Sequence, residues 1–277
     1  MSSTNDKLLV CTVFSGGERD RFWLELQRRQ LQATVGTFDH AVYLGRLANP
    51  AMFHGCLVVG QSTLGVFGQA GHEHLAGLQA LTDYCRMHPY RGYLVLDSDA
   101  FPVAAGWETT LQGMLRRFKK KCAAAVRTEN LDTFAHPSVV YVMEPKSLQF
   151  GYEESRNLAG EVVRDVTLLT PYVPLLKTNA VSPSPVLASI YLDLFYHHGC
   201  GSRKFMMRAT AAGYYDHILA HCASPDALYE QLQADPAGFI AGLMLPGSGE
   251  STGGSANTPY SASLSQRLAA KLARIIH

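Results

Sequence analysis

Two aspartates stand one residue apart directly after the most apolar stretch of the chain. The segment RGYLVLDSDAFPV runs from Arg91 to Val103, and its apolar part ends on Asp97-Ser98-Asp99. Two carboxylates at the end of a buried strand repel each other and lose hydration, which raises their pKa values unless a cation meets them. Mg²⁺ and Mn²⁺ prefer carboxylate oxygens of this kind, together with phosphate oxygens and water. The pattern therefore predicts a divalent metal site.

A second group of polar residues lies much later, in the segment YHHGCGSRKF from Tyr196 to Phe205. An imidazole from His197 or His198 could complete the metal site, and the spacing leaves the choice between the two open. The backbone amides near Gly201 and the guanidinium of Arg203 suit phosphate oxygens.

The elements that must position these residues alternate between strands and helices. Tyr93 to Asp97 has no polar alternation, which is typical of a central parallel strand that is buried on both faces. Amphipathic spacing predicts helices after Gly17, up to Pro89 and from Trp107 to Phe118. Further strands are predicted at 7–14, 40–45, 56–60, 122–128 and 138–143. This order predicts an α/β fold, doubly wound, with a mainly parallel sheet flanked by helices. Ligands of such folds bind at the carboxyl ends of the strands, where Asp97 and Asp99 lie.

The rest of the chain divides into three parts. The region from Tyr152 to Pro225 is less regular, with a helix predicted from Val186 to Phe195, and it is expected to complete the site. We therefore expect one catalytic domain at 1–245. A Gly/Ser-rich linker is predicted at 246–262, because such composition behaves as a flexible coil. An apolar stripe with basic neighbours predicts a C-terminal amphipathic helix at 263–277.

Composition narrows the class of protein. The chain has 277 residues, 47% of them hydrophobic, and a net charge of +1, so it should fold and has no overall field that favours nucleic acid or membranes. Six scattered cysteines without a Cys-x-x-Cys pair argue against a zinc module or a disulfide framework. No apolar run reaches membrane-spanning length and no secretory leader is evident, which predicts a cytoplasmic protein.

Asp97-Ser98-Asp99 resembles the Asp-x-Asp motif of glycosyltransferases with the GT-A fold, which hold a metal bound to the diphosphate of a nucleotide sugar. The resemblance extends from Leu8 to Leu115. His198, Gly201 and Arg203 are similar to the late His-x-x-Gly-x-x-Lys pattern of some of these enzymes, with one residue fewer and Arg in place of Lys. The resemblance implies metal binding by Asp97, Asp99 and His198 or His197, and contact with the donor by Asp97, Ser98, Gly201, Arg203, Ser15 and Arg19.

Other polar residues are open to more than one interpretation. The segment GHEH at 71–74 lacks the second histidine of a His-Glu-x-x-His helix, so it favours a helix start, although His74 could face the donor sugar. No spacing selects a general base among the later carboxylates Asp132, Glu153, Glu154, Glu161 and Asp165. The basic run RRFKKK at 116–121 fits a solvated helix end better than a nucleic-acid contact.

The resemblance implies a Mn²⁺- or Mg²⁺-dependent glycosyltransferase that moves a sugar from a nucleoside diphosphate sugar to an acceptor hydroxyl. A glycan or lipid-linked glycan is the expected acceptor, with protein or modified nucleic acid as alternatives. A non-catalytic GT-A-fold protein that binds a nucleotide or a partner is the runner-up. A HAD-like phosphohydrolase is less favoured, because its Asp-x-Asp normally follows the first strand. The C-terminal helix is expected to contact a membrane surface or to mediate self-association.

Overall fold

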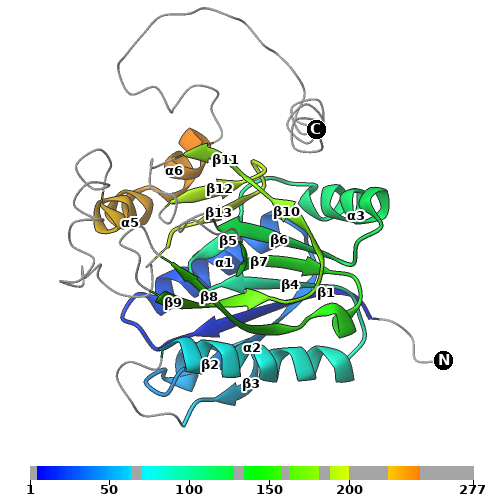
Figure 1. Ribbon diagram of the computed structural model, residues 1–277. Coiled ribbons are helices and arrows are strands. Elements are labelled where there is room, and N and C mark those ends of the chain that lie inside the picture. The colour runs from blue at the N-terminus through cyan, green and yellow to red at the C-terminus, as the bar shows by residue number, and fades with distance from the viewer. Residues whose placement is uncertain are drawn as a thin grey trace, which may run out of the picture.

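The computed structural model describes residues 5–63, 70–127, 134–156, 162–180, 188–199 and 224–243, and it contains an α/β fold (Figure 1). Its main sheet has seven strands in the order β10-β6-β7-β4-β1-β2-β3. β7 is antiparallel to both of its neighbours, and the other strands of this sheet run in one direction. The bounds are β1 Asn5–Phe14, β2 Phe38–Leu44, β3 Leu57–Gln61, β4 Tyr90–Asp97, β6 Cys122–Arg127, β7 Phe134–Val142 and β10 Tyr172–Leu175. The predicted mainly parallel sheet is confirmed.

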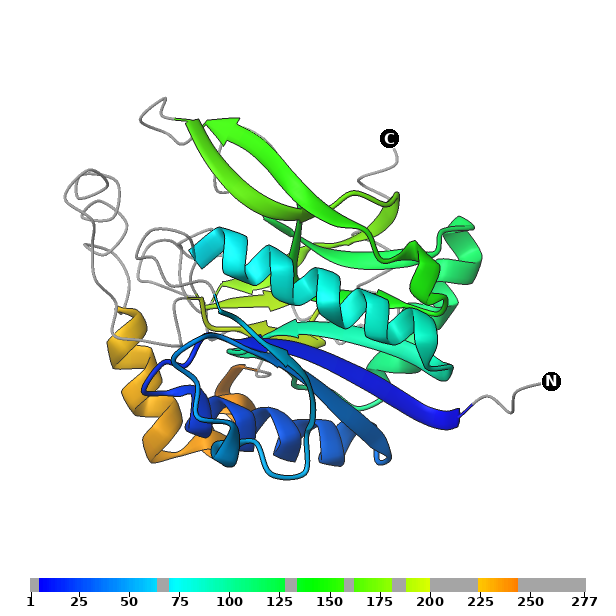
Figure 2. The same ribbon diagram turned by 90° about the horizontal axis from the view of Figure 1, so that it is seen from below.

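Helices cover both faces of this sheet (Figure 2). Alternate residues of β1 point to opposite faces, as in any strand. Leu8 and Val10 pack with α1 and α3, whereas Leu9 and Cys11 pack with α2. The central strands are therefore apolar on both faces because both faces are covered. The helices span Asp20–Thr34 (α1), Ala70–Met87 (α2) and Trp107–Phe118 (α3), close to the predicted positions.

Two smaller sheets complete the fold. The first has the order β11-β12-β13-β5 and is antiparallel throughout. The second is the antiparallel pair β8-β9, which lies beside α2. Their bounds are β5 Ala100–Pro102, β8 Phe150–Arg156, β9 Val162–Leu168, β11 Lys177–Ala180, β12 Ser189–Tyr191 and β13 Phe195–His197. Short 3₁₀ helices occupy Pro50–Met52 and Pro145–Ser147.

The helix predicted from Val186 to Phe195 is wrong for its described residues. Ser189–Tyr191 forms a strand, and residues 192–194 form a turn in which Leu192 and Asp193 have positive φ angles. The pairing of β12 with β13, and of β13 with β5, satisfies the backbone groups of this segment. Long-range pairing has overridden a local helical pattern.

Two further helices, α5 (Pro225–Ala234) and α6 (Pro236–Leu243), pack beside α1. The side chain of Ser224 accepts a hydrogen bond from the backbone N–H of Ala227 and caps the start of α5. Leu228 and Leu232 of α5 join a cluster with Trp23 of α1 and Tyr196 of β13. This packing places α5 against the end of β13, which carries the two adjacent histidines.

The structure tests some of the predictions about the rest of the chain and leaves others untested. The four described cysteines, Cys11, Cys56, Cys85 and Cys122, are free thiols. Among the described helices, none combines the length and the apolar character needed to cross a membrane. The predicted linker at 246–262 and the predicted helix at 263–277 lie outside the described residues.

Candidate metal centre

The two aspartates lie in the turn between β4 and β5. Asp97 is the last residue of β4, and Asp99 immediately precedes β5. β2 and β3 are added on one side of β1, and β4 is added on its other side, so the order in which strands join the sheet reverses between β1 and β4. The crevice outside such a switch point is where open α/β sheets bind ligands. The fold therefore puts the carboxylates at the expected ligand-binding edge.

His197 reaches the carboxylates through a strand pairing that is distant in sequence. It is the last residue of β13, which runs antiparallel to β5, and it lies opposite Ala100 in the register. The backbone N–H of His198 donates to the carbonyl of Asp99 at 3.1 Å, which extends this pairing. The result is an imidazole fixed directly beside the Asp-Ser-Asp turn.

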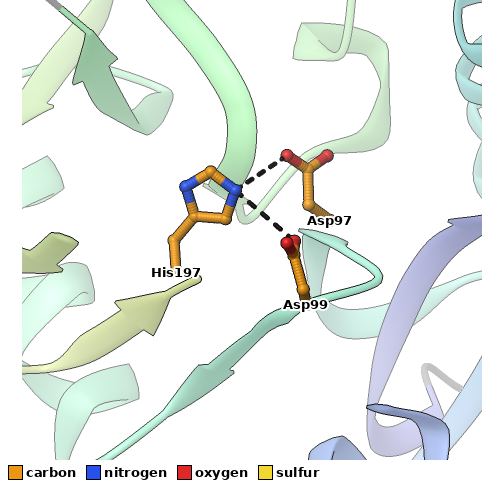
Figure 3. Close-up of side chains that lie close together, drawn as sticks. All are labelled: Asp97, Asp99 and His197. Carbon is orange, nitrogen blue, oxygen red and sulfur yellow. Dashed lines mark ion pairs between the residues drawn. The ribbon is translucent and has the colours of Figure 1, made fainter. Parts of the chain in front are cut away.

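Nε2 of His197 lies between the two carboxylates (Figure 3). It is 3.4 Å from Oδ2 of Asp97 and 3.4 Å from Oδ1 of Asp99. One ligand atom from each residue can be chosen so that all three lie within 4.8 Å of one another. Asp99 and His197 are buried, and Asp97 is half-buried. Two carboxylates and one imidazole form a group that could bind a metal.

Without a metal the cluster holds a proton instead. Burial disfavours a charged imidazole at His197, but the two carboxylates outweigh it and raise the pKa to about 9. Burial likewise disfavours the charged form of Asp99, but His197 lowers the pKa of this carboxyl below its usual value. The proton on Nε2 thus lies where two carboxylates demand positive charge, which is the place for a divalent cation.

His198 has a different environment. Its side chain is fully buried, its Nδ1 is 2.9 Å from the hydroxyl of Tyr196, and its Nε2 is 2.9 Å from the carbonyl of Pro225. A carbonyl can only accept, so Nε2 carries the proton and Nδ1 accepts from the tyrosine. Burial lowers the pKa of His198 to about 4, which keeps the ring neutral. Both nitrogens are therefore engaged away from the carboxylates.

Two more histidines surround Asp97. Nε2 of His74, in the first turns of α2, is 3.5 Å from Oδ1, and Nδ1 of His136, on β7, is 3.7 Å from Oδ2. Nδ1 of His136 also accepts the backbone N–H of Ser138 at 3.1 Å, so a neutral ring carries its proton on Nε2. Sequence reasoning missed His136. A histidine inside the mostly apolar strand FAHPSVVYV was the available indication.

The loop after β1 forms one wall beside this centre. Oδ2 of Asp20 accepts the backbone N–H groups of Gly16 at 2.7 Å and Gly17 at 3.1 Å. Gly16 has a φ of +88°, and a Cβ there would collide with the backbone of Ala48, so the loop requires glycine. Burial raises the pKa of Asp20 to about 6, with a smaller contribution from Asp99. Ser15, a predicted donor contact, is exposed at the start of this loop.

Arg19, the other predicted donor contact at this edge, also holds α5. Its Nη2 is 2.7 Å from Oδ1 of Asp226, and its guanidinium carbon lies 3.9 Å from the ring centroid of Tyr229. The side chain is only 8% exposed. Its Nη1 is buried and has no hydrogen-bond partner among the described residues. Nη2 of the guanidinium thus binds α5, whereas Nη1 could donate a hydrogen bond to a ligand.

Several predicted residues cannot be placed in the centre. Gly201, Arg203, Asp132 and Glu161 lie outside the described residues. Ser98, between the two aspartates, is half-buried. The remaining candidate bases lie on the β8-β9 pair, where Asp165 is half-buried and Glu153 and Glu154 are exposed.

Comparison with known proteins gives only distant similarity. No protein-family model matches the sequence, and no curated protein matches it. A crystal structure of S. aureus TarS, residues 1–349, is similar with 9% identity over 50% of this chain and 47% of that chain, at a TM-score of 0.32. The same TarS fragment in complex with UDP-GlcNAc matches with 10% identity over 63% of this chain and 59% of that chain, at a TM-score of 0.34. This chain spans less than two thirds of either TarS chain.

Proposed function

We propose that the protein is a metal-dependent glycosyltransferase that moves a sugar from a nucleoside diphosphate sugar to an acceptor hydroxyl. The observation that carries this proposal is the convergence of Asp97, Asp99 and His197 at the carboxyl end of β4. Two carboxylates and an imidazole match the ligands that Mn²⁺ accepts, and such an ion would take its remaining ligands from phosphate oxygens and water. Asp97, Asp99 and His197 would hold the ion, whereas His198 would anchor α5.

Each part of the centre has a role in this proposal. A bound Mn²⁺ or Mg²⁺ would offset the negative charge that develops on the leaving diphosphate. His74 and His136 flank Asp97 and would donate hydrogen bonds to phosphate oxygens. Arg203 and the backbone near Gly201 would bind the same diphosphate. Ser15, Ser98 and Nη1 of Arg19 would contact the nucleoside part of the donor.

The acceptor hydroxyl must lose its proton, and a carboxylate is the expected base if the reaction inverts the sugar configuration. Glu153, Glu154 and Asp165 on the β8-β9 pair are the described candidates. A glycan or lipid-linked glycan is the proposed acceptor class. The catalytic unit is proposed to occupy 1–245, with the linker and the C-terminal helix serving location or assembly.

The alternatives make different use of the same residues. A HAD-like phosphohydrolase would carry the motif after its first strand, but here it follows β4. A non-catalytic nucleotide-binding protein could keep the whole metal centre and lack only a base, so it remains the second candidate. Measured turnover of a nucleotide sugar would distinguish the glycosyltransferase from this non-catalytic alternative.

The test is donor turnover by the full chain. A panel of nucleotide sugars that includes UDP-GlcNAc is incubated with Mn²⁺, and release of nucleoside diphosphate is measured with and without a sugar acceptor. Asp99→Asn should keep the fold and lose at least about 100-fold in rate, because removal of one such charge-stabilising group typically costs that much. Full turnover of any donor in excess chelator would remove the metal from the mechanism. Metal-dependent donor binding without turnover would favour the non-catalytic alternative.

A further inference from the structure

A buried polar chain runs through the apolar layer between α1 and the main sheet. Thr12 of β1 and Gln27 of α1 are fully buried, and His40 of β2 is 2% exposed. Nε2 of His40 is 3.1 Å from Oγ1 of Thr12, which donates to Oε1 of Gln27 at 3.1 Å. Buried polar groups are costly in an apolar layer unless their hydrogen bonds are made.

This row of hydrogen-bonded side chains ends at the Asp-Ser-Asp turn. Nε2 of Gln27 donates to the carbonyl of Asp97 at 3.0 Å and to the carbonyl of Ala100 at 2.7 Å. These two carbonyls bracket Ser98 and Asp99, so one amide group joins the end of β4 to the start of β5. On the opposite side of the turn, the carbonyl of Asp99 accepts from the backbone of His198.

The hydrogen bonds have only one consistent direction. The hydroxyl of Thr12 has a single hydrogen, which goes to Gln27, so it must accept from Nε2–H of His40. Gln27 then presents its carbonyl oxygen to Thr12 and both amide hydrogens to the turn. A flipped amide would place oxygen against two carbonyl oxygens, so the two turn carbonyls fix the orientation of the amide group, and Thr12 and His40 complete the hydrogen bonds behind it.

We propose that Gln27 is a positioning residue that sets the separation of the Asp97 and Asp99 carboxylates by clamping the two backbone carbonyls of their turn. This inference rests on the metal site proposed above. Thr12 and His40 support the clamp from β1 and β2. Gln27 does not touch the ion or the donor, and it acts through the backbone that carries the ligands.

The experiment measures Mn²⁺ binding to the full chain by calorimetry and by the electron paramagnetic resonance spectrum of the bound ion. Gln27→Met keeps the approximate length and volume of the side chain but removes both amide N–H donors. We expect about 10-fold weaker Mn²⁺ binding, as for residues that orient metal ligands, and a changed spectrum of the bound ion. The matched control is Gln32→Met, an exposed position on the same helix, which should bind Mn²⁺ as the wild type does.

Thr12→Val is the second variant, because it removes the hydrogen bond that the amide oxygen of Gln27 accepts, which holds the amide from behind, and leaves both donors in place. It should weaken Mn²⁺ binding by less than Gln27→Met does. If Gln27→Met does not fold, Thr12→Val decides alone, and an affinity equal to that of the wild type overturns the clamp.

The outcomes separate this inference from the proposed function. If the wild type binds no Mn²⁺, the proposed metal site fails and the clamp fails with it. If the wild type binds Mn²⁺ and folded Gln27→Met binds it equally, with the same spectrum, only the clamp is wrong. Loss of thermal stability in Gln27→Met with unchanged Mn²⁺ affinity would show a purely structural role and would also overturn the inference.

Discussion

At the residue scale, the decisive feature is a single nitrogen atom between two carboxylates. Nε2 of His197 is at the same distance from Asp97 and Asp99, and burial of this group strengthens the attraction between the charges. In the absence of metal the imidazole carries the positive charge that the carboxylates require. A divalent ion competes with that proton for the same three residues.

This competition predicts a pH dependence. The folded-state pKa of His197 is raised to about 9 from an ordinary value of 6.5. The charged ring therefore stabilises the metal-free fold fully below pH 6.5, and this contribution is lost as the pH rises through about 9. Mn²⁺ must displace the proton, so its affinity should rise by up to about tenfold per pH unit over the same interval. Calorimetry across pH 6.5–8.5 checks this, and an affinity independent of pH would contradict it.

The two adjacent histidines give a second prediction. His197→Gln should lower Mn²⁺ affinity at least about tenfold, and it should also lower the stability of the metal-free fold, because the charged ring that offsets the two carboxylates is lost. His198→Phe should leave Mn²⁺ affinity unchanged, but it leaves the Tyr196 hydroxyl and the Pro225 carbonyl without their partner, at a cost of about 1–3 kcal/mol in the free energy of unfolding. Urea unfolding and Mn²⁺ titration of both variants check the assignment. If only His198→Phe lost Mn²⁺ binding, His198 and not His197 would be the metal ligand.

At the element scale, the centre depends on two elements that approach the motif from distant parts of the sequence. β13 brings His197 beside β5, and α5 packs against the end of β13 and the start of α1. The Arg19–Asp226 ion pair, the Tyr229 ring over the guanidinium and the His198–Pro225 hydrogen bond join these elements. Docking of α5 therefore contributes to the stability of the wall beside the metal centre.

We predict that Asp226→Asn destabilises the protein by about 1–2 kcal/mol. The Arg19 side chain is 8% exposed and would lose its charged partner, but Asp226 is 32% exposed, which limits the loss. The matched control is Glu25→Gln, which breaks an exposed Arg21–Glu25 pair and should change stability by less than about 0.5 kcal/mol. Urea unfolding measures both. Equal effects would show that the Arg19 pair does not hold α5.

The sequence predicted the elements whose patterns are local. The strand ending at Asp97 and the helix from Trp107 to Phe118 followed from apolar runs and helical spacing, and both are present. The small sheet β11-β12-β13-β5 could not be predicted in this way, because its strands have three or four residues and are stabilised by pairing across the chain. For the same reason spacing alone left His197 and His198 undecided. Their roles differ in what they face, and that depends on tertiary packing.

The roles of the buried polar residues could not be predicted from the sequence either. His136, Thr12, Gln27 and His40 lie inside apolar or amphipathic patterns, where a single polar residue has no distinguishing spacing. Their contacts with the Asp-Ser-Asp turn or with one another appear only when β1, β2, β7 and α1 are assembled.

At the scale of the whole molecule, the sheet, its helices and the metal centre lie within the part of the chain that is proposed to be catalytic. A chain ending at Pro246 should therefore keep Mn²⁺-dependent donor turnover on a soluble acceptor. It should lose binding to anionic vesicles or change its oligomeric state, since Arg267, Lys271 and Arg274 would each add about 1 kcal/mol near anionic lipid. Activity and vesicle co-sedimentation of both forms check this. A folded but inactive truncated protein would place the C-terminal region in the active site.

The central claim is that the Asp97, Asp99 and His197 centre binds a nucleoside diphosphate through a divalent metal. Calorimetric titration of a nucleoside diphosphate panel into the full chain, with Mn²⁺ and with excess chelator, tests it most directly. We predict that at least one nucleoside diphosphate binds in the presence of Mn²⁺, and that binding is lost both in chelator and in folded Asp99→Asn. Equal affinity with Mn²⁺, in chelator and in Asp99→Asn would contradict the account.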